Sequence, residues 1–450
     1  MKRIGKKRSE AEGSLKESSI DYGWHGYGQT RPIAFRLGRI VFLHLQHNII
    51  MGLCFSSTRV VSGSNCKQTN RKPNSTTKTE TVTLTETLTL LSLQAAPLPT
   101  LPFDLVAEIL CRIPVKLLIQ LRCLCKCFNS LISDPKFAEK HLRLSTKHRH
   151  LMLCSWNNPY YKFFVYDFPI HSVFSTSSVT QTQLTYPISL KSTYGAPLAV
   201  CSCAGILCLT MRQGSAVLWN PFIGMFKILP TLNNRVPFYP LYSFGYDHFI
   251  NNYKIIAISF FNEKYETRVY TLGTDSWRKI QDFPHLSLYH PSGVFVSGAV
   301  NWLVYDGFRS FIIVSLDLEK ESYQYISQPV SEMSLYTLGV LKDCLFFSAS
   351  NIGDMFLGIW VMMEYGNKES WAKLYHVPFM VDPGLGVFIE VLHVYEDDQL
   401  LLDFYELGSN EKKLVVYGSK TGTFKIHKIQ NADRRTDSEV FLGSLISPCS

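Results

Sequence analysis

The 450-residue sequence lacks the short motifs that mark many enzyme sites. It contains no Gly-rich phosphate loop, no Gly-x-Ser-x-Gly turn and no His-Glu-x-x-His pair. The adjacent carboxylates Asp397 and Asp398 fall in a predicted hairpin turn, where a solvated turn is the better interpretation. We therefore expect no catalytic residue and no cofactor, so the protein is not expected to be an enzyme. The alternative is an oxidase or hydrolase built on a propeller, which would need clustered metal ligands or a titrating dyad in the central channel. A metal assay on the purified propeller would distinguish this class.

Long apolar runs and an export signal are also missing. Residues 33–61 are moderately apolar, but Arg36 and Arg39 help to interrupt them, so no run approaches the ~18–20 residues that a membrane span needs. The basic start, residues 2–8, is followed by acidic and polar residues instead of the apolar core of a signal peptide. We expect no membrane partner and a cytoplasmic or nuclear location. The basic start is either a nuclear-import signal or a solvated tail.

The twelve cysteines show no metal-binding or disulfide pattern. Cys123, Cys125 and Cys127 alternate within a predicted helix, so they should point to different sides of it. The pair Cys201 and Cys203 has no second pair at the spacing of a zinc finger. In a reducing compartment thiols behave as small apolar side chains. We therefore expect no metal site and no disulfide.

Most of the net charge of +9 belongs to the N-terminal part of the chain. Residues 1–95 hold 14 Lys and Arg against 6 Asp and Glu, a surplus of +8, which leaves +1 for the rest. The rest of the chain therefore has no charge-based reason to bind nucleic acid. Residues 1–95 are interpreted as a disordered, basic and Thr-rich extension. A cluster of His141, His148 and His150 is interpreted as a solvated basic link and not as a zinc site.

The first segment with a clear structural pattern is helical. Leu105 and Ile109 lie one turn apart in an apolar stripe, and Pro114 ends the predicted helix. A second apolar run, residues 117–131, keeps helical spacing until Pro135 stops it. Two such short helices have more apolar surface than they can bury against each other. The pattern indicates a docking module.

From about residue 150 the sequence consists of short β-like runs with an internal repeat. Two interleaved series recur about every 50 residues, which predicts four-stranded propeller blades. Residues 151–166 would supply part of a sixth blade, which residues 438–445 would close. Large aromatics are interpreted as core packing, and Gly205 and Asn220 as turn residues. The series are the aromatics Phe226, Trp277, Tyr323, Trp371 and Phe424, and turns near Ala204, Ile250, Ser297, Lys342 and Asp397.

These segments resemble those of plant F-box proteins that carry a kelch-like F-box-associated domain of type 1. The F-box resemblance covers about residues 100–143, and that of the associated domain extends it to about residue 440. The domains expected are the extension at 1–95, an α-helical F-box at 96–143, and an all-β propeller of about six four-stranded blades at 144–450. The strings that carry the resemblance are Leu101-Pro102, Pro114-Val115-Lys116, Arg122-Cys123-Leu124-Cys125-Lys126, Cys203-Ala204-Gly205-Ile206-Leu207-Cys208, Trp219-Asn220-Pro221, Phe244-Gly245-Tyr246-Asp247 and Glu369-Ser370-Trp371.

The resemblance implies a substrate-recognition subunit of a Skp-cullin-F-box ubiquitin ligase. The F-box would bind a Skp-type adaptor, and through it a cullin ligase, while the propeller would bind a target protein for ubiquitination. A propeller scaffold that takes no part in ubiquitination is the alternative. The residues expected to contact the adaptor are Leu101, Pro102, Leu105, Ile109, Leu110, Pro114, Leu118, Leu121, Cys125 and Phe128.

Two loops are the predicted target-binding segments, residues 235–241 and 285–291. Both place aromatic side chains in turn-rich stretches where no strand requires them. Exposed aromatics of this kind often anchor protein interfaces, although they could equally cap blade edges. The residues selected are Phe238, Tyr239 and Tyr289. The sequence does not indicate which protein would be the target.

Overall fold

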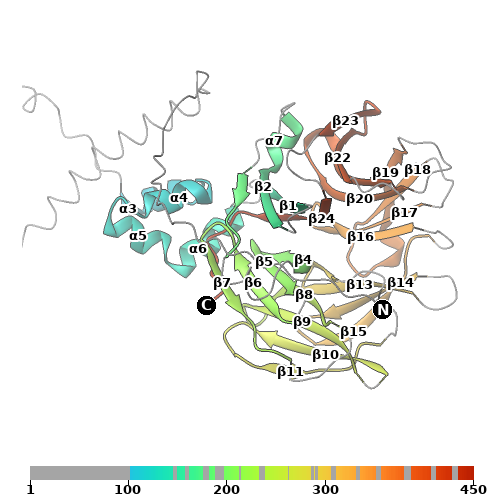
Figure 1. The fold of residues 1–450 in the computed structure, drawn as a ribbon, viewed down its shortest axis with the longest axis horizontal. Coiled ribbons are helices and arrows are strands. Elements are labelled where there is room, and N and C mark those ends of the chain that lie inside the picture. Colours follow the sequence, from blue (N-terminus) through green and yellow to red (C-terminus); the bar gives the residue numbers. More distant parts are fainter. Residues whose placement is uncertain are drawn as a thin grey trace, which may run out of the picture. The chain divides into compact units, whose positions relative to one another are not determined.

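The computed structural model describes four short helices followed by six four-stranded sheets (Figure 1). The extension predicted over residues 1–95 lies outside the described residues. The described residues are 102–144 and 149–449, without the short segments 158–161, 176–181, 188–196, 212–213, 233–238, 262, 285–287, 289–291, 306–310, 331–334, 351–355, 380–386, 407–411 and 428–433.

The F-box segment forms helices α3 (Phe103–Leu110), α4 (Val115–Leu121), α5 (Lys126–Ile132) and α6 (Pro135–Leu144). The first predicted helix is confirmed: α3 begins directly after Pro102. Pro114 has an extended backbone and is the N-cap of α4, so it separates the two helices as expected. The buried side chains of the four helices include Val106, Leu110, Val115, Leu118, Phe128, Ile132, Phe137 and His141.

The second predicted helix is wrong in its extent, because the chain breaks between α4 and α5. Cys125 is extended, with φ −154° and ψ 161°, and caps α5 by accepting the backbone N–H of Phe128 on its Sγ at 3.4 Å. The apolar residues keep helical spacing across this break, so the sequence pattern does not indicate it. The predicted end is confirmed, since α5 stops at Ile132, just before Asp134 and Pro135. This pair also begins a further helix, α6, where the Asp134 carboxylate accepts the N–H of Lys136 at 3.0 Å.

The six sheets are the blades of a propeller, and the predicted architecture is confirmed. Blade 1 is β4–β7, blade 2 is β8–β11, blade 3 is β12–β15, blade 4 is β16–β19, blade 5 is β20–β23, and blade 6 is β24 with β1–β3. The strands are β4 (Pro197–Cys203), β5 (Ile206–Met211), β6 (Ala216–Asn220), β7 (Met225–Ile228), β8 (Leu241–Asp247), β9 (Asn252–Phe261), β10 (Lys264–Thr271), β11 (Trp277–Lys279), β12 (Val294–Val296), β13 (Ala299–Tyr305), β14 (Phe311–Asp317), β15 (Ser322–Ile326), β16 (Leu335–Leu341), β17 (Cys344–Ser350), β18 (Phe356–Met362), β19 (Trp371–Pro378), β20 (Val387–Val394), β21 (Gln399–Glu406), β22 (Lys412–Gly418), β23 (Thr423–His427), β24 (Arg434–Leu442), β1 (Arg149–Asn157), β2 (Lys162–Pro169) and β3 (Thr182–Leu184). The short helix α7 (Ile170–Ser175) follows β2.

The ring is closed by the last strand of the chain. β24 pairs antiparallel with β1, with Val440 opposite Leu151 and Phe441 opposite His150. Blade 6 is thus built from both ends of the propeller sequence, as predicted from residues 438–445. The first strands of the six sheets, β4, β8, β12, β16, β20 and β24, are neighbours around the ring.

The predicted turns are confirmed by the backbone. In blades 1–5 the hairpin after the first strand contains a residue with positive φ, and in blades 1, 3 and 4 the loop has the two residues of a type I′ turn. Ala204 has φ 53° and is followed by Gly205 at φ 80°. The equivalent residues in the other blades are Asn251 at φ 51°, Ser297 at φ 51°, Lys342 at φ 51° and Asp397 at φ 58°.

The core lies between neighbouring blades, because each blade packs its faces against the blades on either side. One buried cluster joins Ile256 and Ile258 of blade 2 to Trp302 and Leu316 of blade 3. Aromatics of the repeat series reach the preceding blade through hydrogen bonds as well. The indole N–H of Trp277 donates to the Pro230 carbonyl at 2.7 Å, and that of Trp371 donates to the Ser327 carbonyl at 3.0 Å. Both tryptophans are only partly buried, so they pack at blade edges and not in the core that their interpretation predicted.

Candidate functional site

The F-box presents large apolar side chains to solvent. Leu105 and Ile109 lie one turn apart on α3 and are 50% and 43% exposed. Leu117 on α4 and Leu124 after it are exposed too, although their positions were not among the predicted contacts. The signal that could have identified them is the number of apolar residues in α4 and its C-terminal turn, which exceeds what one face can bury.

The residues predicted to contact the adaptor divide into an exposed and a buried group. Pro102 and Pro114 are exposed along with Leu105 and Ile109. Leu110, Leu118 and Phe128 are buried within the F-box, and Leu121 and Cys125 are partly buried. Leu101 lies outside the described residues. The apolar stripe read from the sequence therefore includes the internal core of the F-box as well as its surface.

Of the residues predicted to bind the target, only Tyr239 is described, and it is 56% exposed. It lies just before β8. Phe238 and Tyr289 lie in segments outside the described residues. Both predicted loops connect the fourth strand of one blade to the first strand of the next. In the sequence they precede β8 and β12, whereas the hairpin turns at Asn251 and Ser297 follow these strands.

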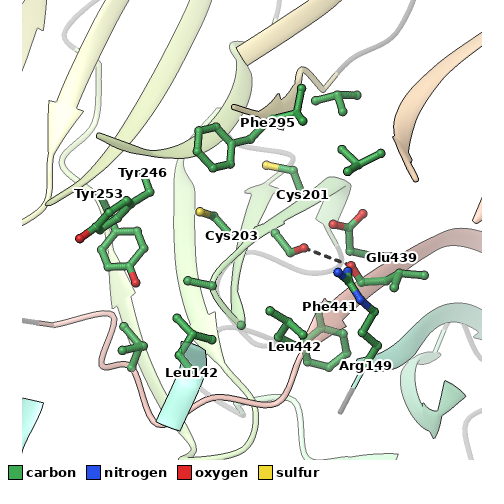
Figure 2. Close-up of a pocket in the computed structure, with 18 of the residues that line it drawn as sticks. Leu142, Arg149, Cys201, Cys203, Tyr246, Tyr253, Phe295, Glu439, Phe441 and Leu442 are labelled. Carbon is green, nitrogen blue, oxygen red and sulfur yellow. Dashed lines mark hydrogen bonds between the residues drawn. The ribbon is translucent and has the colours of Figure 1, made fainter. Parts of the chain in front are cut away.

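A cavity of about 1,100 Å³ extends along the inner strands of the propeller (Figure 2). Cys201 and Cys203 of β4 line it together with Phe295 of β12 and Glu439 of β24. Burial raises the pKa of Cys203 to about 12, so this thiol is protonated and a poor nucleophile at neutral pH. Burial, together with the charge of Arg149, lowers the pKa of His393 to about 4, so its imidazole is neutral. The cavity therefore offers shape and polarity but no activated nucleophile among these groups.

No cluster of three or more potential metal ligands occurs in the part of the chain that the structure describes. Within the same part, no helix has the length and apolarity that crossing a bilayer requires. The interpretation of the histidine cluster as solvated is wrong for two of its members. His141 is fully buried and its Nε2 donates to the Ile113 carbonyl at 2.9 Å. The Nδ1 of His150 lies 2.8 Å from the Asp167 carboxylate. His148 lies outside the described residues.

The Trp-Asn-Pro string holds the segment that follows β24. Asn220 is fully buried, and its side-chain amide donates to the carbonyls of Ser444 at 3.0 Å and Ile446 at 2.9 Å. Gly205 lies against the same segment: a Cβ there would approach the Leu442 carbonyl oxygen to 2.5 Å. Their interpretation as turn residues was therefore incomplete, since both also bind residues 442–446.

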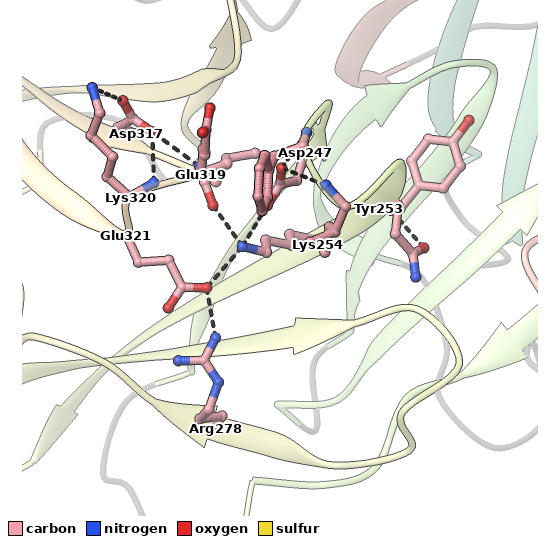
Figure 3. A network of polar contacts seen from close by, with 12 residues as sticks. Asp247, Tyr253, Lys254, Arg278, Asp317, Glu319, Lys320 and Glu321 are labelled. Carbon is pink, nitrogen blue, oxygen red and sulfur yellow. Dashed lines mark hydrogen bonds and ion pairs between the residues drawn. The ribbon is translucent and has the colours of Figure 1, made fainter.

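A buried ion cluster joins blades 2 and 3 (Figure 3). The ammonium of Lys254 lies 2.7 Å from Asp247, 2.8 Å from Glu321 and 2.6 Å from the Leu318 carbonyl. Burial raises the pKa of Glu321, but its hydrogen bonds with Arg278 and Lys254 outweigh burial and hold the pKa below its usual value. Two carboxylates and a blade 3 carbonyl thus satisfy the buried ammonium.

Comparison with known proteins agrees with both parts of this architecture. Residues 98–140 match the F-box domain model, and residues 159–447 match the model of the F-box associated beta propeller domain. The chain therefore belongs to the family of F-box proteins that carry this propeller.

Its relatives include three proteins of Arabidopsis thaliana. The F-box/kelch-repeat protein At3g23880 is 28% identical over 366 residues, which cover 77% of this chain and 96% of the relative. The F-box protein CPR1 is 25% identical, with 78% of this chain and 89% of the relative covered. The F-box protein At3g07870 is 26% identical, with 73% and 87% covered.

Proposed function

We propose that this protein is the substrate-recognition subunit of a Skp-cullin-F-box ubiquitin ligase. The observation that carries the proposal is an F-box with exposed apolar residues followed directly by a complete six-bladed ring. The F-box would bind a Skp-type adaptor, and the adaptor would connect the chain to a cullin. The propeller would bind a target protein. Ubiquitin transfer would then be promoted by proximity, without a bond being made or broken by this chain.

The adaptor contact is assigned to two layers of the F-box. The exposed residues would touch the adaptor, while the buried ones would hold the helices in position. The first group is Pro102, Leu105, Ile109 and Pro114, and the second is Leu110, Leu118, Leu121, Cys125 and Phe128. Leu101, outside the described residues, is proposed as a contact from the sequence alone. Leu117 and Leu124 join the first group because they are exposed and apolar.

The target is assigned to the loops that precede the first strands of blades 2 and 3. Phe238, Tyr239 and Tyr289 are the proposed anchors, because aromatic side chains bury large areas at low entropic cost and Tyr239 is exposed. Replacing Phe238 or Tyr289 by Ala should preserve the fold and adaptor binding but weaken recovery of a target that the propeller captures. We place the protein in the cytoplasm, the nucleus or both, where such ligases would meet their targets. No role in catalysis, membrane binding or nucleic-acid binding is proposed.

Adaptor binding is tested by a pull-down with a purified plant Skp-type adaptor. Ile109→Asp should abolish capture, because a carboxylate would enter an apolar interface in which hot-spot residues typically contribute about 2 kcal/mol or more. The matched control is Leu374→Asp on β19, a leucine with 46% exposure in the propeller. Undiminished capture by the Ile109 variant contradicts the assignment. Failure of the parent chain to bind any adaptor would favour the scaffold alternative.

A further inference from the structure

The exposed apolar residues of the F-box lie beside a stretch of basic charge that begins at Ile109. From Ile109 to Ser133 the chain has four basic residues and no acidic one. This stretch, whose charged residues are all basic, contains all of α4 and α5 and the turns on either side of α4. The basic residues are Arg112, Lys116, Arg122 and Lys126.

Three of these cations are exposed beside the apolar side chains. Arg112 is three residues after Ile109, Lys116 directly precedes Leu117 on α4, and Lys126 begins α5. Within the described part of the chain, none of the three forms an ion pair. Arg122 differs, because its Nε donates to the side-chain oxygen of Asn129 at 3.2 Å. The exposed apolar residues are thus accompanied by three ammonium or guanidinium groups that face solvent.

The nearest acidic residue on the preceding helix, Glu108, interacts with the charge of Arg112, but its hydrogen-bond partner is a residue outside this basic stretch. Glu108 forms an ion pair with Lys140 of α6, and this hydrogen bond lowers the pKa of the Glu108 carboxyl. Both side chains keep solvent contact, so the pair balances its own charge. Asp104 at the start of α3 is exposed and precedes the basic stretch of residues 109–133.

We infer that the F-box recognises an adaptor surface that pairs an apolar floor with a rim of carboxylates. This inference rests on the proposed function and specifies the chemistry of the partner at that site. Lys116, Arg112 and Lys126 are the specificity residues, and their field steers an acidic adaptor face toward Leu105, Ile109 and Leu117. A neutral or basic face would fit the apolar residues but would leave the cations desolvated or opposed.

Electrostatic steering has a kinetic signature that apolar contact lacks. Rim charges chiefly change the association rate constant and its dependence on salt, whereas buried apolar contacts chiefly change the dissociation rate constant. Salt at about 0.15 M screens exposed charges beyond roughly 8 Å, so steering weakens as ionic strength rises. The two contributions can therefore be separated in one series of measurements.

The test measures association of the full chain with a purified plant Skp-type adaptor at ionic strengths from about 0.02 to 0.5 M. The association rate constant of the parent should fall about tenfold across this range. Lys116→Glu should slow association by about tenfold at the lowest salt, and the difference from the parent should disappear at the highest salt. Lys116→Arg should keep the parent rate.

The matched control is Lys264→Glu at the start of β10, an exposed propeller lysine whose reversal changes the net charge equally. It should bind at close to the parent rate. A salt-independent rate for the parent, or equal rates for the two Glu variants, overturns the acidic-face inference while leaving adaptor binding established. Absence of binding by the parent at every salt contradicts both this inference and the proposed function. The parent's salt series needs no variant, so it remains decisive even if Lys116→Glu unfolds.

Discussion

At the scale of single residues, Asn220 connects two distant parts of the propeller. Its buried amide satisfies two carbonyls of the segment after β24, and its oxygen accepts the N–H of Phe222 at 3.0 Å. Asn220→Ala would leave these buried polar groups without their partner. Each such group costs about 1–3 kcal/mol. We expect a loss of about 2–4 kcal/mol in the free energy of unfolding, measured by urea denaturation.

The control for this prediction is Gln324→Ala on β15, an exposed amide. It should change stability by less than about 0.5 kcal/mol. Equal effects of the two substitutions would mean that losing the Asn220 hydrogen bonds costs no more stability than losing an exposed amide side chain.

Lys254 is a second residue whose replacement should have a large effect. Lys254→Met removes the cation and leaves Asp247 and Glu321 as buried or partly buried carboxylates. Removal of one partner from a buried ion cluster typically costs about 3–5 kcal/mol. Lys320→Met is the neighbouring control, because the Lys320 side chain is exposed and its pair with Asp317 is long at 3.4 Å. A melting curve for Lys254→Met that matches the control curve would contradict this prediction.

His393 should make the propeller sensitive to acid. Burial lowers its pKa to about 4 in the folded chain, against about 6.5 when unfolded. The contribution of the neutral imidazole to the free energy of unfolding is thus fully present above pH 6.5. It is lost as the pH falls toward 4, because the unfolded chain binds the proton more tightly than the folded chain. The loss should reach about 1–3 kcal/mol. The difference in melting temperature between the parent and His393→Asn should therefore depend on pH between 6.5 and 4, and a constant difference would exclude this role.

At the scale of elements, the segment after β24 should behave as a part of the ring. Ser444 is fully buried and Leu445 is 8% exposed, so these residues contribute core as well as hydrogen bonds. A chain that stops at Leu442 should lose several kcal/mol, and Asn220→Ala should then have little additional effect because its partners are gone. Additive effects of the two changes in a double-mutant cycle would show that Asn220 acts through other contacts.

The elements also show what the sequence could predict. Strands and turns follow from local chemistry, so Ala204 and Ser297 could be placed at turns from spacing and glycine neighbours alone. The break before α5 could not be predicted, since a cysteine sulfur is an uncommon cap and the apolar spacing does not change there. Contacts of Asn220 and His141 were misjudged because their partners are far away in the sequence. Which apolar residues of the F-box stripe are exposed could be determined only from the way the helices pack.

At the scale of the whole molecule, the F-box and propeller should be stable without the N-terminal residues. Residues 1–95 have the Thr-rich and Lys-rich composition of chains with little continuous core. A chain that begins at residue 96 should melt within a few degrees of the full chain and should bind the adaptor equally. A large drop in the melting temperature would place part of this segment on the folded body and would move the predicted domain boundary.

The closure of blade 6 by β24 has a consequence for how the protein is made. During synthesis on the ribosome, β1 and β2 emerge before the other blades, yet their sheet partner β24 follows all the other propeller strands in the sequence. Until then the nascent ring has an open seam with an unpaired apolar edge, which other chains can bind. The propeller therefore completes folding only after residues 434–442 have left the ribosome. A premature stop anywhere before Arg434 should yield aggregated product instead of a smaller working receptor.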